Sequence, residues 1–296
     1  MLWIVATLIA ALAQTARNAM QSSLTAVLGT VGAAQVRFLY GLPFALLFLA
    51  LAAALTDARV PPPTIAFIGY TGAGALAQIV GTVLLLAAMH AGSFSVATAF
   101  TKTEPVQVAI FAFAVLGERL TPLAIGAIVI ATAGVVLAAW RGSGRSGAKS
   151  VSAVLFGVTS GAFFALAAVG FRGGILALGD GSPYLRATTT LAWALGLQAV
   201  FLGAWMAVFR HAALMESLLR WRQSLGAGFM GALASQFWFL GFSLTAAANV
   251  RTLALVEVLF AHAVARRLFR ERTSRREALG MVLVVAGVAL LLASIA

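Results

Sequence analysis

Two glutamates lie deep within long apolar stretches of the sequence. Of the eight acidic residues, only Glu104 and Glu257 are placed in this way, and the others fall in loops or near the ends of apolar stretches. A carboxylate at bilayer depth is costly, so it must face the interior of a helix bundle, meet a partner or stay protonated. We therefore predict a coupling or gating role for both glutamates, with the proton as the candidate coupling ion. The alternative is structural: each glutamate would hold helices together through hydrogen bonds to backbone or hydroxyl groups.

A lysine and a proline accompany the first of these glutamates. Lys102 lies two positions before Glu104, roughly 200° around a helix, so the two side chains cannot pair on one helical face. Lys102 could bind the carboxylate of an anionic or zwitterionic substrate. Alternatively, it could be a cation that snorkels to the membrane surface or pairs with an acid for structural reasons. For Arg251 we favour this second interpretation. Pro105 removes a helical hydrogen bond in mid-span, so it could line a binding site or act as a hinge. The second half has Val258 at the equivalent position, so we expect no such bend there.

Four further side chains within apolar stretches are weaker candidates for substrate binding. Gln78 and Gln236 could each offer a donor and an acceptor to a ligand, although singly each is better explained by a hydrogen bond between helices. Asn18 is the third polar candidate, and Trp238 could stack on an aromatic or cationic substrate or simply pack between helices. The three histidines are spread over three segments and there is no cysteine, so the sequence predicts no metal site, no cofactor and no catalytic residue.

Apolar helices must position these candidates. Hydrophobic residues make up 62% of the 296 positions and charged residues only 9%, which is far from the composition of a soluble protein. Turn residues such as Gly29, Pro61 and Gly179 separate stretches that are each long enough to cross a hydrocarbon core of roughly 30 Å. The sequence therefore predicts an all-α polytopic membrane protein with ten transmembrane helices, at roughly 2–24, 32–55, 64–88, 93–116, 121–140, 151–171, 184–209, 224–244, 247–269 and 273–294.

The two halves of the sequence resemble each other. A shift of 153 positions aligns the later part of each half without a gap and superposes Glu104 on Glu257, Glu118 on Glu271, Arg119 on Arg272 and Gly134 on Gly287, whereas the earlier part matches more loosely. We predict a first five-helix repeat over 1–140, a basic linker over 141–150 and a second five-helix repeat over 151–296. Because five is odd, the two copies must enter the membrane from opposite sides, which gives the inverted repeat typical of secondary transporters.

Basic residues outnumber acidic residues by 20 to 8, and nearly all of them lie at the ends of apolar stretches. We interpret them, Arg17 and Arg37 included, as membrane anchors rather than as a surface for nucleic acid. If the helices alternate, most of these residues fall on one face, which the positive-inside rule assigns to the cytoplasm, with both chain termini outside. The expected partners are a small-molecule substrate and membrane lipid, without nucleic acid. We expect a multi-pass protein of the inner (plasma) membrane, as a monomer or a homodimer.

Matching motifs recur at the end of the fourth predicted helix of each half. They read Glu104-Pro105-Val106, Leu116 to Thr121 and Gly126 to Val135 in the first half, and Glu257-Val258-Leu259, Glu271 to Ser274 and Gly280 to Val288 in the second. With these motifs nearly the whole chain resembles the EamA-like branch of the drug/metabolite transporter superfamily, although Arg270 replaces the first half's Gly117. The resemblance implies ten helices in two inverted repeats. It also implies export of small metabolites or toxic compounds through a central cavity that opens alternately to each side.

We predict a secondary transporter that exports amino acids or similar small amphipathic metabolites by alternating access. A multidrug or organic-cation efflux carrier is the alternative. A channel would generally need a polar ring built by symmetry from several copies. A membrane-embedded enzyme would need a cluster of ligating or nucleophilic residues, which the sequence does not provide.

Overall fold

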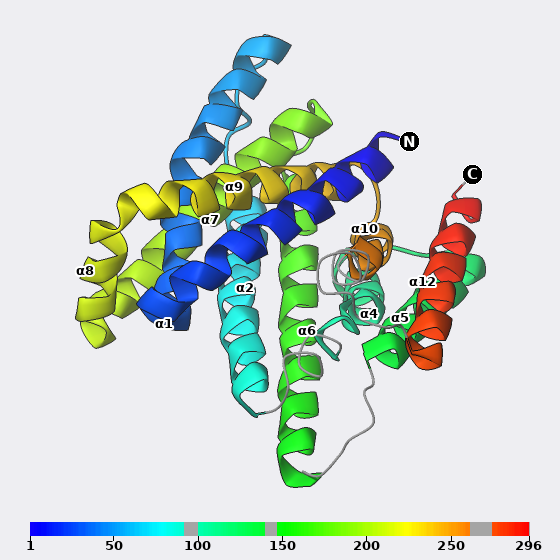
Figure 1. The fold of residues 1–296 in the computed structure, drawn as a ribbon. Helices are drawn as coiled ribbons and strands as arrows, with labels where there is room; N and C mark the ends of the chain where they lie inside the picture. The colour runs from blue at the N-terminus through cyan, green and yellow to red at the C-terminus, as the bar shows by residue number, and fades with distance from the viewer. Residues whose placement is uncertain (92–99, 140–146, 261–273, 296) are drawn as a thin grey trace. The chain divides into compact units, whose positions relative to one another are not determined.

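The protein is described by a computed structural model, which places residues 1–91, 100–139, 147–260 and 274–295 (Figure 1). Every element within these ranges is a helix, so the all-α prediction is confirmed. In this part of the chain, six helices are long and apolar enough to cross a membrane: Val31–Thr56, Ile65–Leu85, Val151–Ala177, Pro183–Phe209, Trp221–Leu244 and Arg275–Ala293. Shorter apolar helices accompany them. The total of ten spans stays a prediction.

The first element, α1, covers Leu2–Thr56 and so contains the first two predicted spans. Gly29 interrupts it with φ 66° and ψ 177°, which lie outside the helical region. A positive φ is strained for a residue with a β-carbon, and glycine adopts it freely. The predicted turn at Gly29 is therefore confirmed, although the helical assignment continues on both sides of it.

The other helices follow most of the predicted spans. They are α2 (Ile65–Ala91), α4 (Glu104–Leu116), α5 (Pro122–Ala139), α6 (Gly147–Ala177), α7 (Pro183–Phe209), α8 (His211–Leu219), α9 (Trp221–Leu244), α10 (Ala247–Leu253), the 3₁₀ turn η1 (Ala254–Val256) and α12 (Arg275–Ala293). Four of them differ from expectation. Helix α4 begins at Glu104, whereas the predicted span begins near residue 93, and α10 with η1 covers only the start of the span predicted at 247–269. Residues 92–99 and 261–269 of these two spans lie outside the described part of the chain. Helix α6 begins inside the predicted linker, and α8 occupies what was expected to be a simple connection between two spans.

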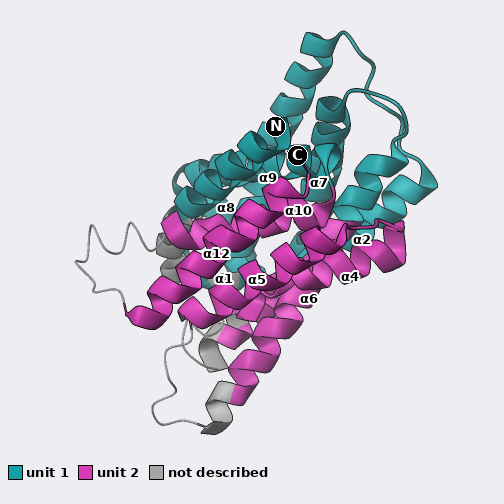
Figure 2. Cartoon of the chain, turned by 90° about the vertical axis from the view of Figure 1, so that its right-hand side faces the viewer, with its two compact units in different colours: residues 1–79, 170–245 teal, residues 80–169, 246–296 magenta. Residues whose placement is uncertain are grey.

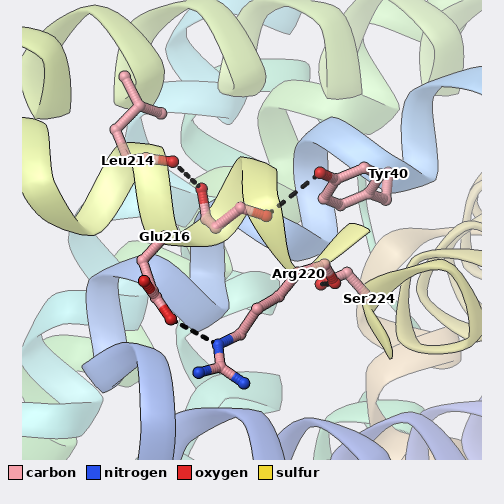
Figure 3. Close-up of polar contacts among 6 residues, drawn as sticks. Tyr40, Leu214, Glu216, Arg220 and Ser224 are labelled. Atoms are coloured by element: carbon pink, nitrogen blue, oxygen red, sulfur yellow. Dashed lines mark hydrogen bonds and ion pairs between the residues drawn. The ribbon is translucent and has the colours of Figure 1, made fainter. Parts of the chain in front are cut away.

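The short helix α8 is held by polar contacts near its C-terminal end (Figure 3). The Tyr40 hydroxyl, on α1, donates to the carbonyl oxygen of Ser217 at 3.2 Å. Glu216 Oε1 accepts from Arg220 Nε at 2.6 Å, one helical turn later. A helix of nine residues is too short to be stable alone. These contacts explain why it forms between α7 and α9.

Packing divides the chain into two compact units, and each unit draws on both sequence halves (Figure 2). Unit 1 comprises Met1–Ile79 and Gly170–Thr245, and unit 2 comprises Val80–Val169 and Ala246–Ala296. The divisions fall within α2 and α6, so each of these helices contributes to both units. The predicted repeats over 1–140 and 151–296 are continuous segments of the sequence, whereas each unit groups residues that contact one another in the structure. The inverted repeat therefore stays a prediction.

In unit 1, α9 packs along α1 through a small residue (Figure 1). A β-carbon built on Gly228 would lie 2.7 Å from the backbone of Tyr40, closer than real side chains approach. The neighbouring Phe229 packs edge-on against Phe44, with ring centroids 5.2 Å apart. Small residues let membrane helices approach closely and gain packing energy. This contact fixes α1 against α9, where several of the candidate residues lie.

In unit 2, α5 and α12 lie side by side and also meet through glycines (Figure 1). A β-carbon on Gly134 would lie 2.6 Å from the carbonyl oxygen of Gly280. One on Gly287 would lie 2.6 Å from the backbone nitrogen of Ala131. Gly134 and Gly287 are equivalent residues of the duplicated sequence. The last helix of each sequence half thus uses the same position to pack against the other.

Candidate functional site

Four charged side chains meet in unit 2 and form two ion pairs. Lys102 Nζ contacts Glu257 Oε1, and Arg251 Nε lies 3.0 Å from Glu104 Oε1. Arg251 and Glu104 are close enough to form an ion pair, but the N–H group of Arg251 Nε does not point at Glu104 Oε1 as a hydrogen bond requires. Each pair joins a residue of the first sequence half to a residue of the second. We call Lys102, Glu104, Arg251 and Glu257 the charged quartet; within it, two positive charges balance two negative charges.

The charged quartet is largely withdrawn from the surface. The exposed fraction of the side chain is 10% for Glu104, 14% for Arg251 and Glu257, and 25% for Lys102. When one partner of a buried ion pair is removed, the charge left behind costs about 3–5 kcal/mol. Lys102 is the most accessible member, so water or a ligand reaches the Lys102–Glu257 pair more readily than the Arg251–Glu104 pair. As the sequence indicated, Lys102 and Glu104 do not pair with each other, and Arg251 is a structurally paired cation.

In the first half, a break in the helical backbone positions the quartet residues. Lys102 and Thr103 form a turn, and α4 starts at Glu104 with Thr103 as its N-cap residue. Pro105 therefore lies in the first turn of α4, where its missing N–H removes no helical hydrogen bond. The expectation that Pro105 interrupts a helix in mid-span is wrong in this respect, because the break precedes the proline. As a result, Glu104 lies at a helix N-terminus, whose partial positive charge favours a carboxylate.

Helix α6 holds this break in place. Thr101 Oγ1 donates to the carbonyl oxygen of Gly157 at 3.3 Å, and Gln107 Nε2 donates to that of Val158 at the same distance. A β-carbon on Gly161 would lie 2.9 Å from the Thr101 carbonyl oxygen, so only glycine allows α6 to come this close. The turn that carries Lys102 is thus fastened on both sides to a neighbouring helix.

The second half contains a matching break. Ala254–Val256 forms a 3₁₀ turn directly before Glu257, at the position equivalent to the first break. Its middle residue, Leu255, is buried in a core that also contains Ala131, Val135 and Val284. The expectation that the second half lacks the bend stays a prediction, because Leu253, Ala254 and Glu257 keep right-handed helical backbone angles around this 3₁₀ turn. The 3₁₀ turn contains no proline, and its middle residue, Leu255, is packed in the core.

The uncharged candidates for substrate binding lie in unit 1, and each one whose side chain the structure describes has a partner on another helix. Three hydrogen bonds make these links: Gln198 Nε2 to Gln78 Oε1 (2.5 Å), Gln236 Nε2 to Thr188 Oγ1 (2.8 Å) and Trp238 Nε1 to Gln14 Oε1 (3.2 Å). Gln236 also has a buried side-chain oxygen for which the described residues supply no hydrogen-bond partner. That oxygen has acceptor capacity left for a ligand or water.

The predicted site residues thus fall into two groups. Lys102, Glu104, Pro105 and Glu257 come together in unit 2, whereas Gln78, Gln236 and Trp238 belong to unit 1. Asn18 lies in α1, and its side chain is outside the described part of the structure. Within that part, His, Asp and Glu side chains form no group of three or more that could hold a metal ion.

Sequence reasoning missed two arginines of unit 1. Arg17 and Arg37 were assigned to the membrane surface, yet Arg17 is only 7% exposed and both side chains pack against Gly231 of α9. Each arginine is close to the end of a predicted span, so their sequence positions resemble those of ordinary anchors. The available signal was that Arg17 lies inside the first predicted span, 2–24, rather than in the connection after it.

Comparison with known proteins identifies a relationship for almost the whole chain. A family model, the EamA-like transporter family, matches residues 1–140 and 151–293. No curated protein matches the chain. A solved structure, titled only "Crystal structure of protein", is similar with a TM-score of 0.71 and 16% identical residues, over 97% of this chain and 95% of that one. At this level of identity the likeness shows a shared fold.

Proposed function

Because this chain belongs to the EamA-like transporter family, a family of membrane transporters, we propose that it exports amino acids or similar small amphipathic metabolites across the inner membrane. The proposed mechanism is alternating access between two inverted repeats. The observation that carries this proposal is the charged quartet, in which each glutamate contacts a cation from the other sequence half.

Alternating access needs an element with two discrete arrangements. An ion pair is either closed or open, and the two pairs of the charged quartet lie beside the turn at Lys102–Thr103 and the 3₁₀ turn Ala254–Val256. We assign gating to these pairs, together with Pro105, which starts the helix after the first break. Opening one pair would free a carboxylate and a cation to meet substrate, water or a proton.

Proton coupling follows from the same arrangement. A proton bound by Glu257 would remove its negative charge and weaken its attraction to Lys102, so that the pair opens more readily. The same reasoning applies to Glu104 and Arg251. A proton gradient would thereby bias the equilibrium between closed and open pairs.

We assign substrate binding to Lys102, Asn18, Gln78, Gln236 and Trp238. Two observations support this set. Lys102 is the most exposed member of the charged quartet, and Gln236 retains an oxygen that can accept a hydrogen bond from a ligand. A cation suits a carboxylate, and an uncharged acceptor suits an ammonium group, which are the two charged groups of an amino acid.

Flux measurements on the purified protein in liposomes test the proposal. We expect uptake of radiolabelled amino acids to saturate with concentration and to accelerate when unlabelled substrate is present on the far side. Glu104→Gln and Glu257→Gln should abolish the response to a pH gradient, whereas Glu216→Gln, which changes an exposed acid on α8, should not. Flux that rises linearly with concentration would indicate a channel. A double Gln variant that keeps its full response to the gradient would exclude the two glutamates from coupling.

A further inference from the structure

The short helix α8 connects two membrane-crossing helices of unit 1. Helix α7 ends at Phe209, α8 covers His211–Leu219 and α9 begins at Trp221, so one residue separates each helix from the next (Figure 1). Both α7 and α9 are long and apolar enough to cross a membrane. A short connection between two such helices lies where the hydrocarbon core of the bilayer ends. This topology places α8 at the membrane–water interface.

One side of α8 packs against α1, near the start of the apolar span Val31–Thr56. A β-carbon built on Gly32 would lie 3.9 Å from the carbonyl oxygen of Ala213, and the Tyr40 hydroxyl donates to that of Ser217 at 3.2 Å. Ser217 is fully buried. Helix α8 is therefore held beside the first turns of a third membrane-crossing helix, rather than extending away from the membrane into water.

The opposite side of α8 is apolar and exposed. At about 100° per residue, Met215, Leu218 and Leu219 lie on the far side of the helix from Ala213 and Ser217. Their exposed fractions are 39%, 40% and 77%. An amphipathic helix in the membrane interface buries a face of this kind at the boundary between headgroups and acyl chains. The outer face of α8 is thus suited to contact with lipid.

Aromatic side chains beside α8 point to the same location. Trp205 and Phe209 lie at the end of α7 with their ring centroids 5.6 Å apart, and Trp221 starts α9. All three are exposed, at 43%, 66% and 47%. The guanidinium carbon of Arg222 lies 5.2 Å from the centroid of the Trp221 ring. Tryptophan is enriched at membrane interfaces, where its ring lies at the level of the lipid headgroups.

The two ends of α8 carry excess positive charge. Three arginines, Arg210, Arg220 and Arg222, and one acid, Glu216, give the segment 210–222 a net charge of +2. Glu216 pairs with Arg220 one turn away, so the charges of these two side chains offset each other (Figure 3). The remaining arginines, Arg210 before α8 and Arg222 after it, are both exposed. Basic residues at this depth are attracted to anionic lipids.

We infer that α8 and its flanking arginines bind anionic phospholipids of the surrounding bilayer. Arg210 and Arg222 each hold the phosphate of one headgroup, and the outer face of α8 contacts the upper part of the acyl chains. A guanidinium suits this role because it binds phosphate with two parallel hydrogen bonds. A second copy of this chain fits the surface less well, since a symmetric contact through α8 would bring like-charged arginines together.

The test compares lipids that differ in headgroup charge. The full-length protein, purified in detergent and stripped of lipid, is titrated with phosphatidylglycerol or with phosphatidylcholine of the same acyl chains, and bound molecules are counted by native mass spectrometry. We expect phosphatidylglycerol to bind more tightly. Arg210→Gln and Arg222→Gln should each weaken the binding of one phosphatidylglycerol about fivefold and leave phosphatidylcholine unchanged. The matched control is Arg59→Gln, which changes an exposed arginine two residues after Asp57, in a connection without net charge.

Two further measurements separate the bilayer lipid from a free anion. Leu219→Gln should weaken the binding of both lipids, because it places a polar group on the outer face of α8. Glycerol phosphate carries the charge of the headgroup without acyl chains, and we expect it not to displace bound phosphatidylglycerol. Displacement by glycerol phosphate would indicate a site for small anions and would overturn the assignment to lipid.

Equal affinity for the two lipids, or unchanged phosphatidylglycerol binding in both folded arginine variants, would also overturn the inference. A change from dimer to monomer in these variants, without loss of lipid, would assign α8 to a contact between copies instead. Size-exclusion profiles identify any variant that fails to fold. In that case the wild type decides: its binding of phosphatidylglycerol should weaken as ionic strength rises, and binding that is insensitive to salt would refute the role of the arginines.

Discussion

The Arg251–Glu104 pair offers a quantitative test of the charged quartet. Its atoms are 3.0 Å apart, and the two side chains are 14% and 10% exposed. At an effective dielectric constant of about 20, the Coulomb attraction at this distance is roughly 5 kcal/mol, and the loss of hydration offsets part of it. We therefore expect Glu104→Gln and Arg251→Met each to lower the free energy of unfolding by about 3 kcal/mol, and the double variant to show a coupling energy of about 2 kcal/mol.

The Glu216–Arg220 pair is the control, because it is shorter and yet more exposed. Its atoms are 2.6 Å apart, with exposed fractions of 42% and 36% for the two side chains. Surface pairs of this kind contribute less than about 0.5 kcal/mol. Reversible unfolding in mixed micelles, followed by tryptophan fluorescence, gives the four free energies of each cycle. Equal coupling in the two cycles, or none for Arg251 and Glu104, would refute the argument that burial makes the quartet strong.

Three further outcomes follow from the structure. Gly287→Val should lower the free energy of unfolding by at least about 2 kcal/mol because a β-carbon there meets the backbone of Ala131. The control is Gly126→Ala, which has open space around it and should leave the free energy of unfolding unchanged or slightly raised. Similar losses of stability in both variants would contradict the packing account. Thr101→Val should cost about 1 kcal/mol by removing the hydrogen bond to α6, and a variant as stable as the wild type would show that this bond does not hold the break. A reporter fused after Ala296 should be active only outside the cytoplasm, and activity in the cytoplasm would reverse the assigned topology.

The sequence predicted the all-helical fold correctly, whereas Glu104, expected near the middle of a helix, lies at the start of α4. Apolar length alone indicates which segments cross a membrane, because the bilayer sets a minimum span. The angle between Lys102 and Glu104 on one helix showed that they cannot pair, and the structure gives each a partner from the other half. Such reasoning needs only the geometry of a single helix.

The sequence could not predict which residues contact each other between helices, or where the helical backbone is interrupted, for a physical reason. Helical periodicity states which side a residue faces, but not which neighbouring helix occupies that side. The 3₁₀ turn at Ala254–Val256 has no proline or glycine to signal it, and it coincides with the burial of Leu255 in a core built from α5 and α12. Arg17 was misjudged for the same reason, since its burial depends on how closely Gly231 lets it approach α9.

A charge exchange across Lys102 and Glu257 tests most directly whether pairing between the halves drives transport. Amino-acid counterflow is measured in liposomes that contain the wild type, Lys102→Glu, Glu257→Lys or the doubly exchanged variant. We predict that either single reversal abolishes most of the flux, because two like charges then face each other, and that the double exchange restores a substantial part of it. Single variants that transport normally, or a double variant no better than the weaker single one, would contradict the account.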